Sequence, residues 1–295
     1  MTREHVARTA ATTDPDPGMG TAMSRRLLIG AGMLALALPG PAFAEDTLSR
    51  VRRRGFLKVA TNAGWEPQSF LGDDGSLSGF DIDVAREIAR RLHVAVRFDT
   101  PDWALMTGGH WHGRWDMMVG SATPTKARRG VVDFAGIYYY SPYVFAVNAR
   151  SPIRTAADLN GKLIGVETGT TSEDYMRRRL EIDDPGAPVT RYWLRPGAIR
   201  TYASSILPFQ DLRLPPGVRL DAVLALEQTV LQAIREHYPI RVVPGPYAFR
   251  EPLTVITDKG DPAWTSLIRG LIEAMRADGT LGRFARRWYG KDYSR

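Results

Sequence analysis

The chain has 295 residues, with 39 Lys and Arg against 32 Asp and Glu, and it contains no cysteine. The small positive excess is spread along the chain without a basic cluster interleaved with aromatic residues, which argues against nucleic-acid binding. Without cysteine there is no disulfide and no lipid-anchor thiol, and a chain of this length can bury one large core or the cores of two lobes.

The first 44 residues are typical of an export signal. Ser24-Arg25-Arg26 precedes an apolar run over residues 27–38, and Ala42-Phe43-Ala44 has the small-x-small pattern that signal peptidase requires. The run is too short to span a bilayer comfortably. We therefore expect residues 1–44 to be a cleaved signal peptide, of general or twin-arginine type, and the mature protein to be periplasmic.

From Gly55 onward, short apolar runs alternate with helical periods, which is the rhythm of βαβ units. The expected strands and extended runs are 56–60, 94–98, 116–119, 138–147, 163–166, 220–224 and 252–257. Helices are expected at 82–92, 156–159 and 172–180, with two more between 264 and 288, and residues 181–214 are expected to be extended or irregular. Two α/β units joined by two extended crossings predict two lobes with a cleft between them.

A candidate carboxylate receptor lies near the end of the segment from Gly79 to Phe134. Thr123 suits an N-cap and Pro124 the first helical position, which would place Arg128 just inside a helix with free N-terminal amides. A guanidinium assisted by amides and a hydroxyl matches both oxygens of a carboxylate. From these residues alone, a surface arginine on a capped helix explains the pattern equally well.

These segments, in this order, resemble the family 3 extracellular solute-binding proteins, the amino-acid-binding cluster that serves bacterial ABC importers. The resemblance covers about Gly55 to Gly290 and is carried by Gly79-Phe80-Asp81-Ile82-Asp83, Trp115-Asp116, Arg128 with Val131-Val132-Asp133-Phe134, Tyr138-Tyr139-Tyr140-Ser141, Asp158-Leu159-Asn160-Gly161-Lys162, Gly165-Val166, Gly169-Thr170-Thr171, Leu220-Asp221-Ala222-Val223, Asp278-Gly279-Thr280-Leu281 and Trp288-Tyr289-Gly290. It implies an α/β fold of the two-lobed periplasmic-binding-protein type II, with a two-strand hinge and a ligand cleft between the lobes. Lobe 1 would hold residues 46–143 plus 252–295, and lobe 2 residues 144–251.

The resemblance also implies a set of ligand-binding residues. Trp65 and Trp103 would sandwich the ligand body, Arg128 would bind its carboxylate, and Thr123 would add a hydroxyl contact. Gly120 and Ser121 match positions whose backbone faces the ligand. In lobe 2, Thr170 and Thr171 open a helix that would hold the same carboxylate from the other side, and Thr170 with Glu173 has the spacing of a capping box.

One position departs from the family pattern. The aspartate that usually binds the ligand's α-ammonium, five residues after Asp221, is Leu226 here, and an ammonium buried against leucine would be unpaired. Glu227 is the neighbouring carboxylate that could substitute for it. The segment 191–218 also differs from the usual pattern and could supply another anchor.

The function expected from the resemblance is transport: a binding protein, not an enzyme, that captures a small carboxylate-bearing solute by lobe closure. A polar amino acid or derivative is the expected ligand, the membrane permease of an ABC importer is the expected partner, and the protein is expected to be a monomer without cofactor or metal. His110 and His112 are only two histidines in a Gly-rich turn, which is weak support for a metal site. The alternative is an enzyme similar to cyclohexadienyl dehydratase on the same fold, for which Glu66, Glu167 and Glu173 are available carboxylates.

Overall fold

The computed structural model describes residues 46–294, so the predicted signal peptide lies outside the described part of the chain. Residues from Ala44 onward form one compact unit. Within the described range, no helix combines the length and the apolar character needed to cross a membrane.

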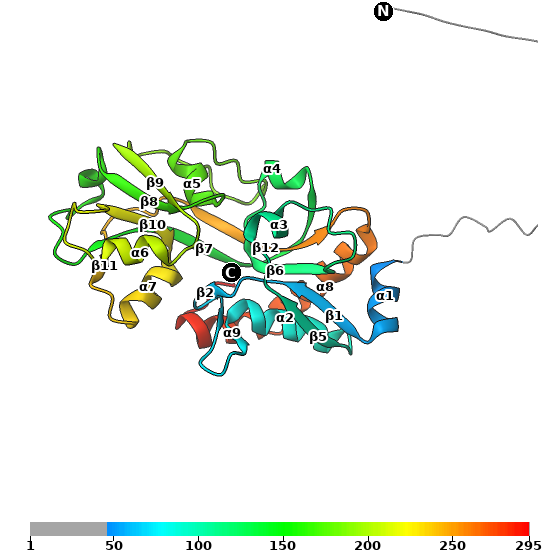
Figure 1. Ribbon diagram of the computed structural model, residues 1–295. Coiled ribbons are helices and arrows are strands. Elements are labelled where there is room, and N and C mark those ends of the chain that lie inside the picture. The colour runs from blue at the N-terminus through cyan, green and yellow to red at the C-terminus, as the bar shows by residue number, and fades with distance from the viewer. Residues whose placement is uncertain (1–45, 295) are drawn as a thin grey trace, which may run out of the picture. The chain divides into compact units, whose positions relative to one another are not determined.

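A mixed sheet runs through the whole described unit (Figure 1). Its strands are β1 (Phe56–Ala60), β5 (Ala95–Asp99), β6 (Met117–Ala122), β7 (Val132–Asn148), β8 (Leu163–Glu167), β9 (Ala198–Tyr202), β10 (Ala222–Leu226), β11 (Ile240–Val242) and β12 (Arg250–Asp258). The order is β5-β1-β6-β12-β7-β10-β8-β9, and β11 also pairs with β7. A small separate sheet contains β2 (Gly64–Trp65), β3 (Ser69–Leu71) and β4 (Leu77–Ser78).

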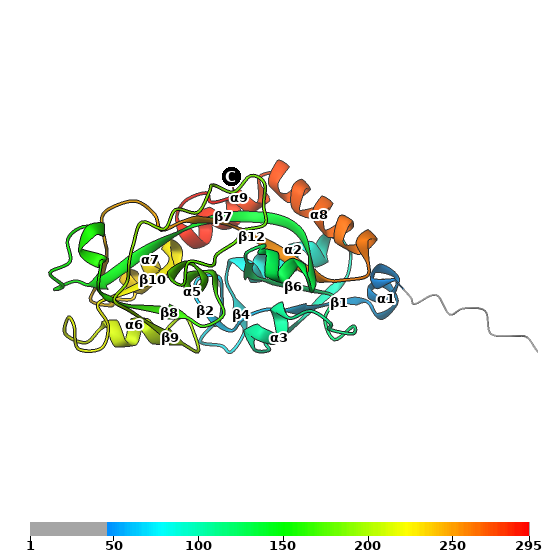
Figure 2. The same cartoon turned by 90° about the horizontal axis from the view of Figure 1, so that it is seen from above.

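Strand β7 belongs to both halves of the sheet, as the long green strand in Figure 2 shows. Residues 132–142 pair antiparallel with β12, whereas residues 143–148 pair antiparallel with β10 and β11. The parallel strands β5, β1 and β6 lie on one side of this junction, and β10, β8 and β9 lie on the other. This is the two-lobed α/β architecture expected from the sequence. We keep the names lobe 1 for residues 46–143 and 252–295 and lobe 2 for residues 144–251, which are the limits predicted from the sequence.

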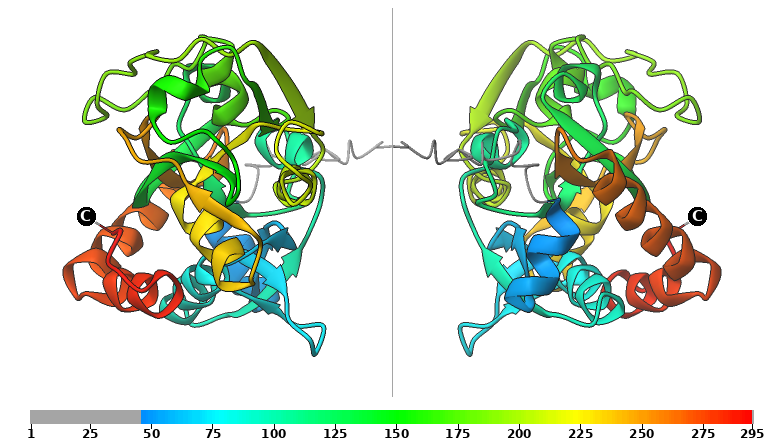
Figure 3. Two further views of the ribbon diagram at one scale, coloured as in Figure 1. Left: turned by 90° about the vertical axis from the view of Figure 1, so that its left-hand side faces the viewer. Right: turned by 90° about the vertical axis from the view of Figure 1, so that its right-hand side faces the viewer.

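Helices cover both halves of the sheet. They are α1 (Thr47–Arg54), α2 (Phe80–Arg91), α3 (Trp103–Thr107), α4 (Lys126–Arg129), η1 (Ala156–Leu159), α5 (Thr171–Met176), α6 (Leu207–Leu212), α7 (Glu227–Arg235), α8 (Pro262–Ala277) and α9 (Thr280–Tyr289). Figure 3 shows α8 and α9, in orange and red, together at the lobe 1 end, where both pack against α2.

The core of lobe 1 explains much of the Gly-Phe-Asp-Ile-Asp motif. Phe80 stacks on Tyr138 with ring centroids 5.7 Å apart and meets Tyr139 edge to face at 5.1 Å. Asp81, which is fully buried, accepts hydrogen bonds from the Tyr138 hydroxyl at 2.7 Å and from Ser121 at 2.8 Å. Burial raises the pKa of Asp81 to about 7, although both hydrogen bonds act in the opposite direction. The motif is therefore a packing and hydrogen-bonding unit of lobe 1.

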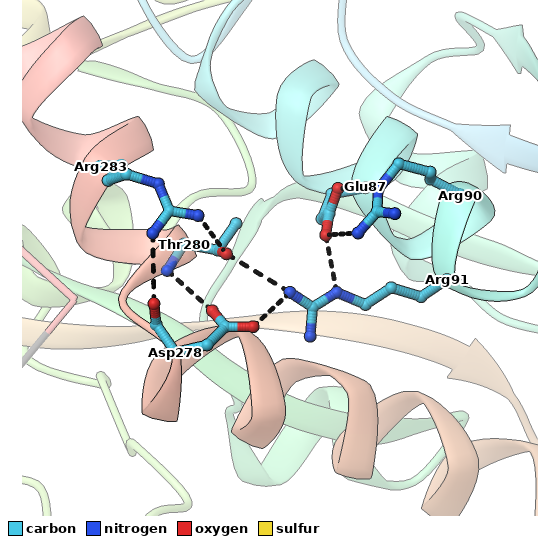
Figure 4. Close-up of polar contacts among 6 residues, drawn as sticks. All are labelled: Glu87, Arg90, Arg91, Asp278, Thr280 and Arg283. Carbon is cyan, nitrogen blue, oxygen red and sulfur yellow. Dashed lines mark hydrogen bonds and ion pairs between the residues drawn. The ribbon is translucent and has the colours of Figure 1, made fainter.

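A polar network at the surface joins the C-terminal end of α2 to the junction between α8 and α9 (Figure 4). Arg91 donates to Glu87 at 2.7 Å and to Asp278 at 2.6 Å. Asp278 also accepts from the backbone N–H of Thr280 at 3.0 Å, and its hydrogen bonds to Thr280 and Arg91 hold its pKa well below the usual value. The Asp-Gly-Thr motif thus forms the turn between the two helices that the sequence predicted.

Several predicted elements need correction. The helix expected at 172–180 ends at Met176, and residues 181–214, expected to be extended or irregular, contain β9 and the short helix α6. The helix containing Arg128 begins at Lys126, with Thr125 as its N-cap, so Thr123 does not cap it. Thr125 accepts from the Arg128 N–H at 3.3 Å, while the Thr123 hydroxyl is used by another partner.

Candidate functional site

A buried carboxylate, Glu251, lies at the junction of the two lobes, near the start of β12. Its side chain accepts hydrogen bonds from the hydroxyl of Thr123, which follows β6 in lobe 1, and from the hydroxyl of Thr171 in lobe 2 at 2.7 Å. Glu251 is 1% exposed. Burial raises its pKa to about 7, although the threonine hydrogen bonds and the charge of Arg128 lower it. One acid thus links two of the residues that the sequence assigned to ligand binding.

Arg128 extends from α4 across the same junction. Its Nη1 donates to the carbonyl of Thr123 at 3.0 Å, and its Nη2 donates to the carbonyl of Gly169 in lobe 2 at 3.2 Å. Burial lowers the pKa of Arg128, and the negative charge of Glu251 acts in the opposite direction. The guanidinium is therefore fixed in place by carbonyls from both lobes, with N–H donors to spare because it has five.

The two predicted aromatic residues lie together beside Arg128. The Trp103 ring is 5.2 Å from the guanidinium carbon, and its indole N–H donates to the Gly169 carbonyl at 3.2 Å. Trp65 meets Trp103 edge to face, with ring centroids 6.1 Å apart. The two rings contact each other instead of facing one another across an open space. The predicted sandwich of a ligand between Trp65 and Trp103 therefore remains a prediction.

The lobe 2 loop before α5 differs from the capping box that the sequence predicted. Thr170 is the N-cap residue, but its hydroxyl donates back to the carbonyl of Glu167 at 2.8 Å instead of capping the helix. The Glu173 carboxylate accepts from the backbone N–H of Gly169, at 2.8 Å, and not from Thr170. Gly169 has a φ of 72°, a left-handed conformation that turns this N–H toward Glu173. Thr171, not Thr170, directs its hydroxyl to the lobe junction.

Gly120 and Ser121 are buried at the end of β6. The Ser121 side chain belongs to the lobe 1 network: it donates to Asp81 and accepts from the Tyr139 hydroxyl at 2.6 Å. The Ser121 backbone N–H donates to Tyr138 at 2.8 Å. These bonds show that Ser121 is held in the lobe 1 network beside the site. Contact between a ligand and the backbone of Gly120 or Ser121 remains a prediction.

Glu227 does not join the other predicted residues. Its carboxylate accepts from Lys291 at 2.8 Å and from the Tyr293 hydroxyl at 2.7 Å, so it holds the C-terminal segment against α7. Leu226, the preceding residue, lines a cavity between the lobes together with Trp65 and Tyr143. The carboxylate next to Leu226 in sequence therefore faces a different part of the molecule.

A sequence comparison decides the family. The family described as bacterial extracellular solute-binding proteins, family 3, matches residues 57–291. The chain belongs to this family. As a solute-binding protein of family 3, it has Arg128, Thr123 and Thr171 where the two lobes meet, with Glu251 as an acid that no sequence motif indicated.

Relatives of this solute-binding protein span nearly its whole length. It is 28% identical to the L-cystine-binding protein TcyJ of Escherichia coli and 26% identical to an L-arginine-binding protein of Pseudomonas aeruginosa; both alignments cover 92% of this chain and 98% of the relative. A solved structure of the ancestral amino acid-binding protein AncCDT-1, a precursor of cyclohexadienyl dehydratase, matches with a TM-score of 0.69 at 27% identity, covering 82% of this chain and 99% of that one. An ArgBP mutant from T. maritima matches in fold, with a TM-score of 0.68 at 22% identity.

Proposed function

We propose that this solute-binding protein captures a free amino acid in the periplasm, between its two lobes, and delivers it to the permease of an ABC importer. The observation that carries the proposal is that opposite charges lie near each other at the lobe junction: Arg128 is held by carbonyls, and Glu251 by hydroxyls, from both lobes. A free amino acid carries the complementary charges. The names of the relatives, which include amino-acid-binding and L-arginine-binding proteins, agree with this ligand class.

In this proposal Arg128 binds the ligand's carboxylate and Glu251 its α-ammonium. Glu251 would supply the negative charge that Leu226 lacks, because its carboxylate is buried close to Arg128 while Glu227 is turned away. The hydroxyls of Thr123 and Thr171 donate to Glu251 and keep oxygen lone pairs for an ammonium. A ligand held by groups from both lobes stabilises the closed form, because only that form offers all the contacts.

Replacement of Arg128 by alanine tests the site. Calorimetric titration with a panel of amino acids identifies the ligands, and Arg128→Ala is expected to weaken each of them about 30-fold or more, because it leaves a carboxylate without its cation. Arg90→Ala is the control: Arg90 is an exposed arginine of α2 in lobe 1, paired with Glu87 within the same helix, and affinity should stay within about 3-fold. Unchanged binding in Arg128→Ala would refute the site assignment.

One observation favours a second candidate, an enzyme of the cyclohexadienyl dehydratase kind. Burial raises the pKa values of Glu167 and Glu251 to about 7, which is the range of an efficient general acid. Incubation of the protein with prephenate, followed by product analysis, separates the two functions. Turnover that is lost in Glu167→Gln or Glu251→Gln would replace the binding-protein proposal.

A further inference from the structure

A buried aspartate in the first turn of α2 contacts the strand that leads to the candidate site. Asp81 is fully buried, and its two carboxylate oxygens accept hydrogen bonds from Ser121 of β6 at 2.8 Å and from Tyr138 of β7 at 2.7 Å. Only these two bonds oppose the effect of burial, which raises the pKa of Asp81 to about 7. Burial of a carboxylate without a cation is costly, and an uncharged side chain of the same shape would serve packing alone as well.

Ser121 has a backbone conformation that serine rarely adopts. Its φ is 50°, in the left-handed region. It lies in an irregular part of β6: Met118 and Ala122 pair with Ile256 and Thr254 of β12, so three residues of β6 face one residue of β12. Such a bulge bends its strand and redirects the residues that follow. A residue other than glycine keeps a left-handed φ only where its surroundings hold it there.

A buried hydrogen-bond network holds Ser121 in this conformation. Its hydroxyl donates to Asp81 and accepts from the Tyr139 hydroxyl at 2.6 Å, and its backbone N–H donates to the Tyr138 hydroxyl at 2.8 Å. Tyr138 in turn donates to Asp81, so Ser121 is connected to Asp81 both directly and through Tyr138. The ionised carboxylate accepts both bonds, whereas an amide in its place would direct its own N–H group toward one of the two donors.

The chain enters the candidate site directly after this bulge. Two residues beyond Ser121, the Thr123 carbonyl accepts from Arg128 at 3.0 Å, and the Thr123 hydroxyl donates to Glu251. The position of Thr123 depends on the direction in which the chain leaves Ser121. A displacement of about 1 Å is enough to weaken the contacts of a bound ligand, so the conformation of Ser121 affects both charged groups of the site.

We propose that Asp81 is a positioning residue for ligand binding, which holds Ser121 in its left-handed conformation and so sets the position of Thr123. This inference rests on the proposed amino-acid-binding function. Asp81 does not touch the ligand and acts through Ser121 and Thr123 on Arg128 and Glu251. The first acid of the Gly-Phe-Asp-Ile-Asp motif thus has a role in binding as well as in packing.

The second acid of the motif is a matched control. Asp83, two residues after Asp81 on α2, accepts from the indole N–H of Trp288 on α9 at 2.8 Å and also pairs with Arg287 and Arg86. Within residues 46–294 its hydrogen bonds and ion pairs are thus with α2 and α9 and not with β6. Loss of its charge weakens the packing of lobe 1 without changing the strand that leads to the site.

Calorimetric titration at pH 8, where Asp81 is largely ionised, separates positioning from loss of the fold. The ligand is the amino acid of the panel that binds most tightly to the unmodified protein. Asp81→Asn should bind it about 10-fold or more weakly with unchanged stoichiometry, because the site is misplaced and not unfolded. Asp83→Asn should keep the affinity within about 3-fold while its free energy of unfolding falls. A lower stoichiometry at unchanged affinity in Asp81→Asn would show a purely structural role and overturn the inference.

Replacement of Ser121 by alanine tests whether Asp81 acts through this residue. Ser121→Ala keeps the backbone but removes the hydroxyl that donates to Asp81, so it should weaken binding by about 5-fold or more. The double variant should bind within about 2-fold of the weaker single variant, because both changes break the same connection. Losses that multiply in the double variant would overturn action through Ser121. If Asp81→Asn does not fold, Ser121→Ala decides alone, and unchanged affinity in it overturns the inference.

The unmodified protein separates this inference from the proposed function. Tight binding of an amino acid that is equally tight in Asp81→Asn overturns the positioning role and leaves the amino-acid-binding function in place. Failure of every amino acid in the panel to bind the unmodified protein overturns the proposed function and this inference together.

Discussion

Burial of Glu167 predicts a pH-dependent gain in stability when its charge is removed. The folded-state pKa of about 7 exceeds the usual value of 4.5, so the folded protein favours the protonated acid. This contribution to stability is present below about pH 4.5 and is lost as the pH rises through 7. We expect Glu167→Gln to raise the free energy of unfolding by about 1 to 3 kcal/mol at pH 8, with little change at pH 4.5.

Urea denaturation of the ligand-free protein at the two pH values measures this difference. Glu273→Gln should change the free energy of unfolding by less than about 0.5 kcal/mol at either pH, since that side chain is exposed. Equal stability of Glu167→Gln and the unmodified protein at pH 8 would mean that the carboxylate is solvated or paired. A gain in stability with a loss of amino-acid affinity is the behaviour expected of a ligand-binding group.

The residues of the candidate site differ in how far the sequence could predict them. Arg128, Thr123 and Thr171 could be chosen from the sequence because each belongs to a recognisable motif, and the structure places all three at the lobe junction. Glu251 has no such signal, because it lies in a largely apolar strand and its partners come from distant segments. Glu167 was visible as an acid before a Gly-Thr-Thr turn, but only the fold shows that no side chain within residues 46–294 pairs with its carboxylate.

At the scale of elements, the helix that opens with Gly-Phe-Asp-Ile-Asp was predictable, but the reason for its glycine was not. Gly79 has a φ of 125°, and a Cβ atom there would lie 2.3 Å from the carbonyl oxygen of Gln68. The close approach lets the Phe80 N–H donate to the Pro67 carbonyl at 3.1 Å and the Asp81 N–H to the Gln68 carbonyl at 2.9 Å. Gly79 thus fixes α2 against the segment before β3.

Alanine substitution separates this packing role from backbone strain alone. Gly79→Ala should lower the free energy of unfolding by more than about 2 kcal/mol, because both the φ angle and the contact with Gln68 exclude a side chain. Gly75→Ala is the control: Gly75 has a φ of 74° but no atom within 4 Å of a Cβ, so a loss of about 1 kcal/mol is expected. Chemical denaturation of both variants measures the difference, and equal losses would rule out the packing role.

The amphipathic helix α7 was not predicted although its sequence has a helical period, whereas other missed elements lie in polar or interrupted segments. Residues 181–214 contain many prolines, arginines and exposed side chains, and β9 and α6 are short, so neither a strand nor a helix period is sustained there. The same applies to α4, whose four residues cannot show a period: its cap was predicted at Thr123 because Pro124 suits a first helical position, whereas the structure has Thr125 as the cap. Boundaries of such short elements depend on tertiary contacts.

At the scale of the whole molecule, β7 and β12 join the lobes, and several side chains close the space between them. Arg128 and Trp103 of lobe 1 both donate to Gly169 of lobe 2, and Arg129 pairs with Asp183. The two-lobe organisation followed from the order of motifs, because two α/β units need crossing strands between them. The closed geometry, in which Glu251 contacts both lobes, depends on side-chain packing that the order of motifs does not specify.

Recognition of both charged ends of a free amino acid at the lobe junction is tested most directly by calorimetric titration. The protein is titrated with the amino acid of the panel that binds most tightly, with the corresponding amine, which lacks the carboxylate, and with the corresponding α-deaminated acid. We expect both analogues to bind about 30-fold or more weakly than the amino acid, since each leaves Arg128 or Glu251 without its counter-charge. Binding of the decarboxylated amine as tight as that of the amino acid would contradict recognition of the carboxylate by Arg128.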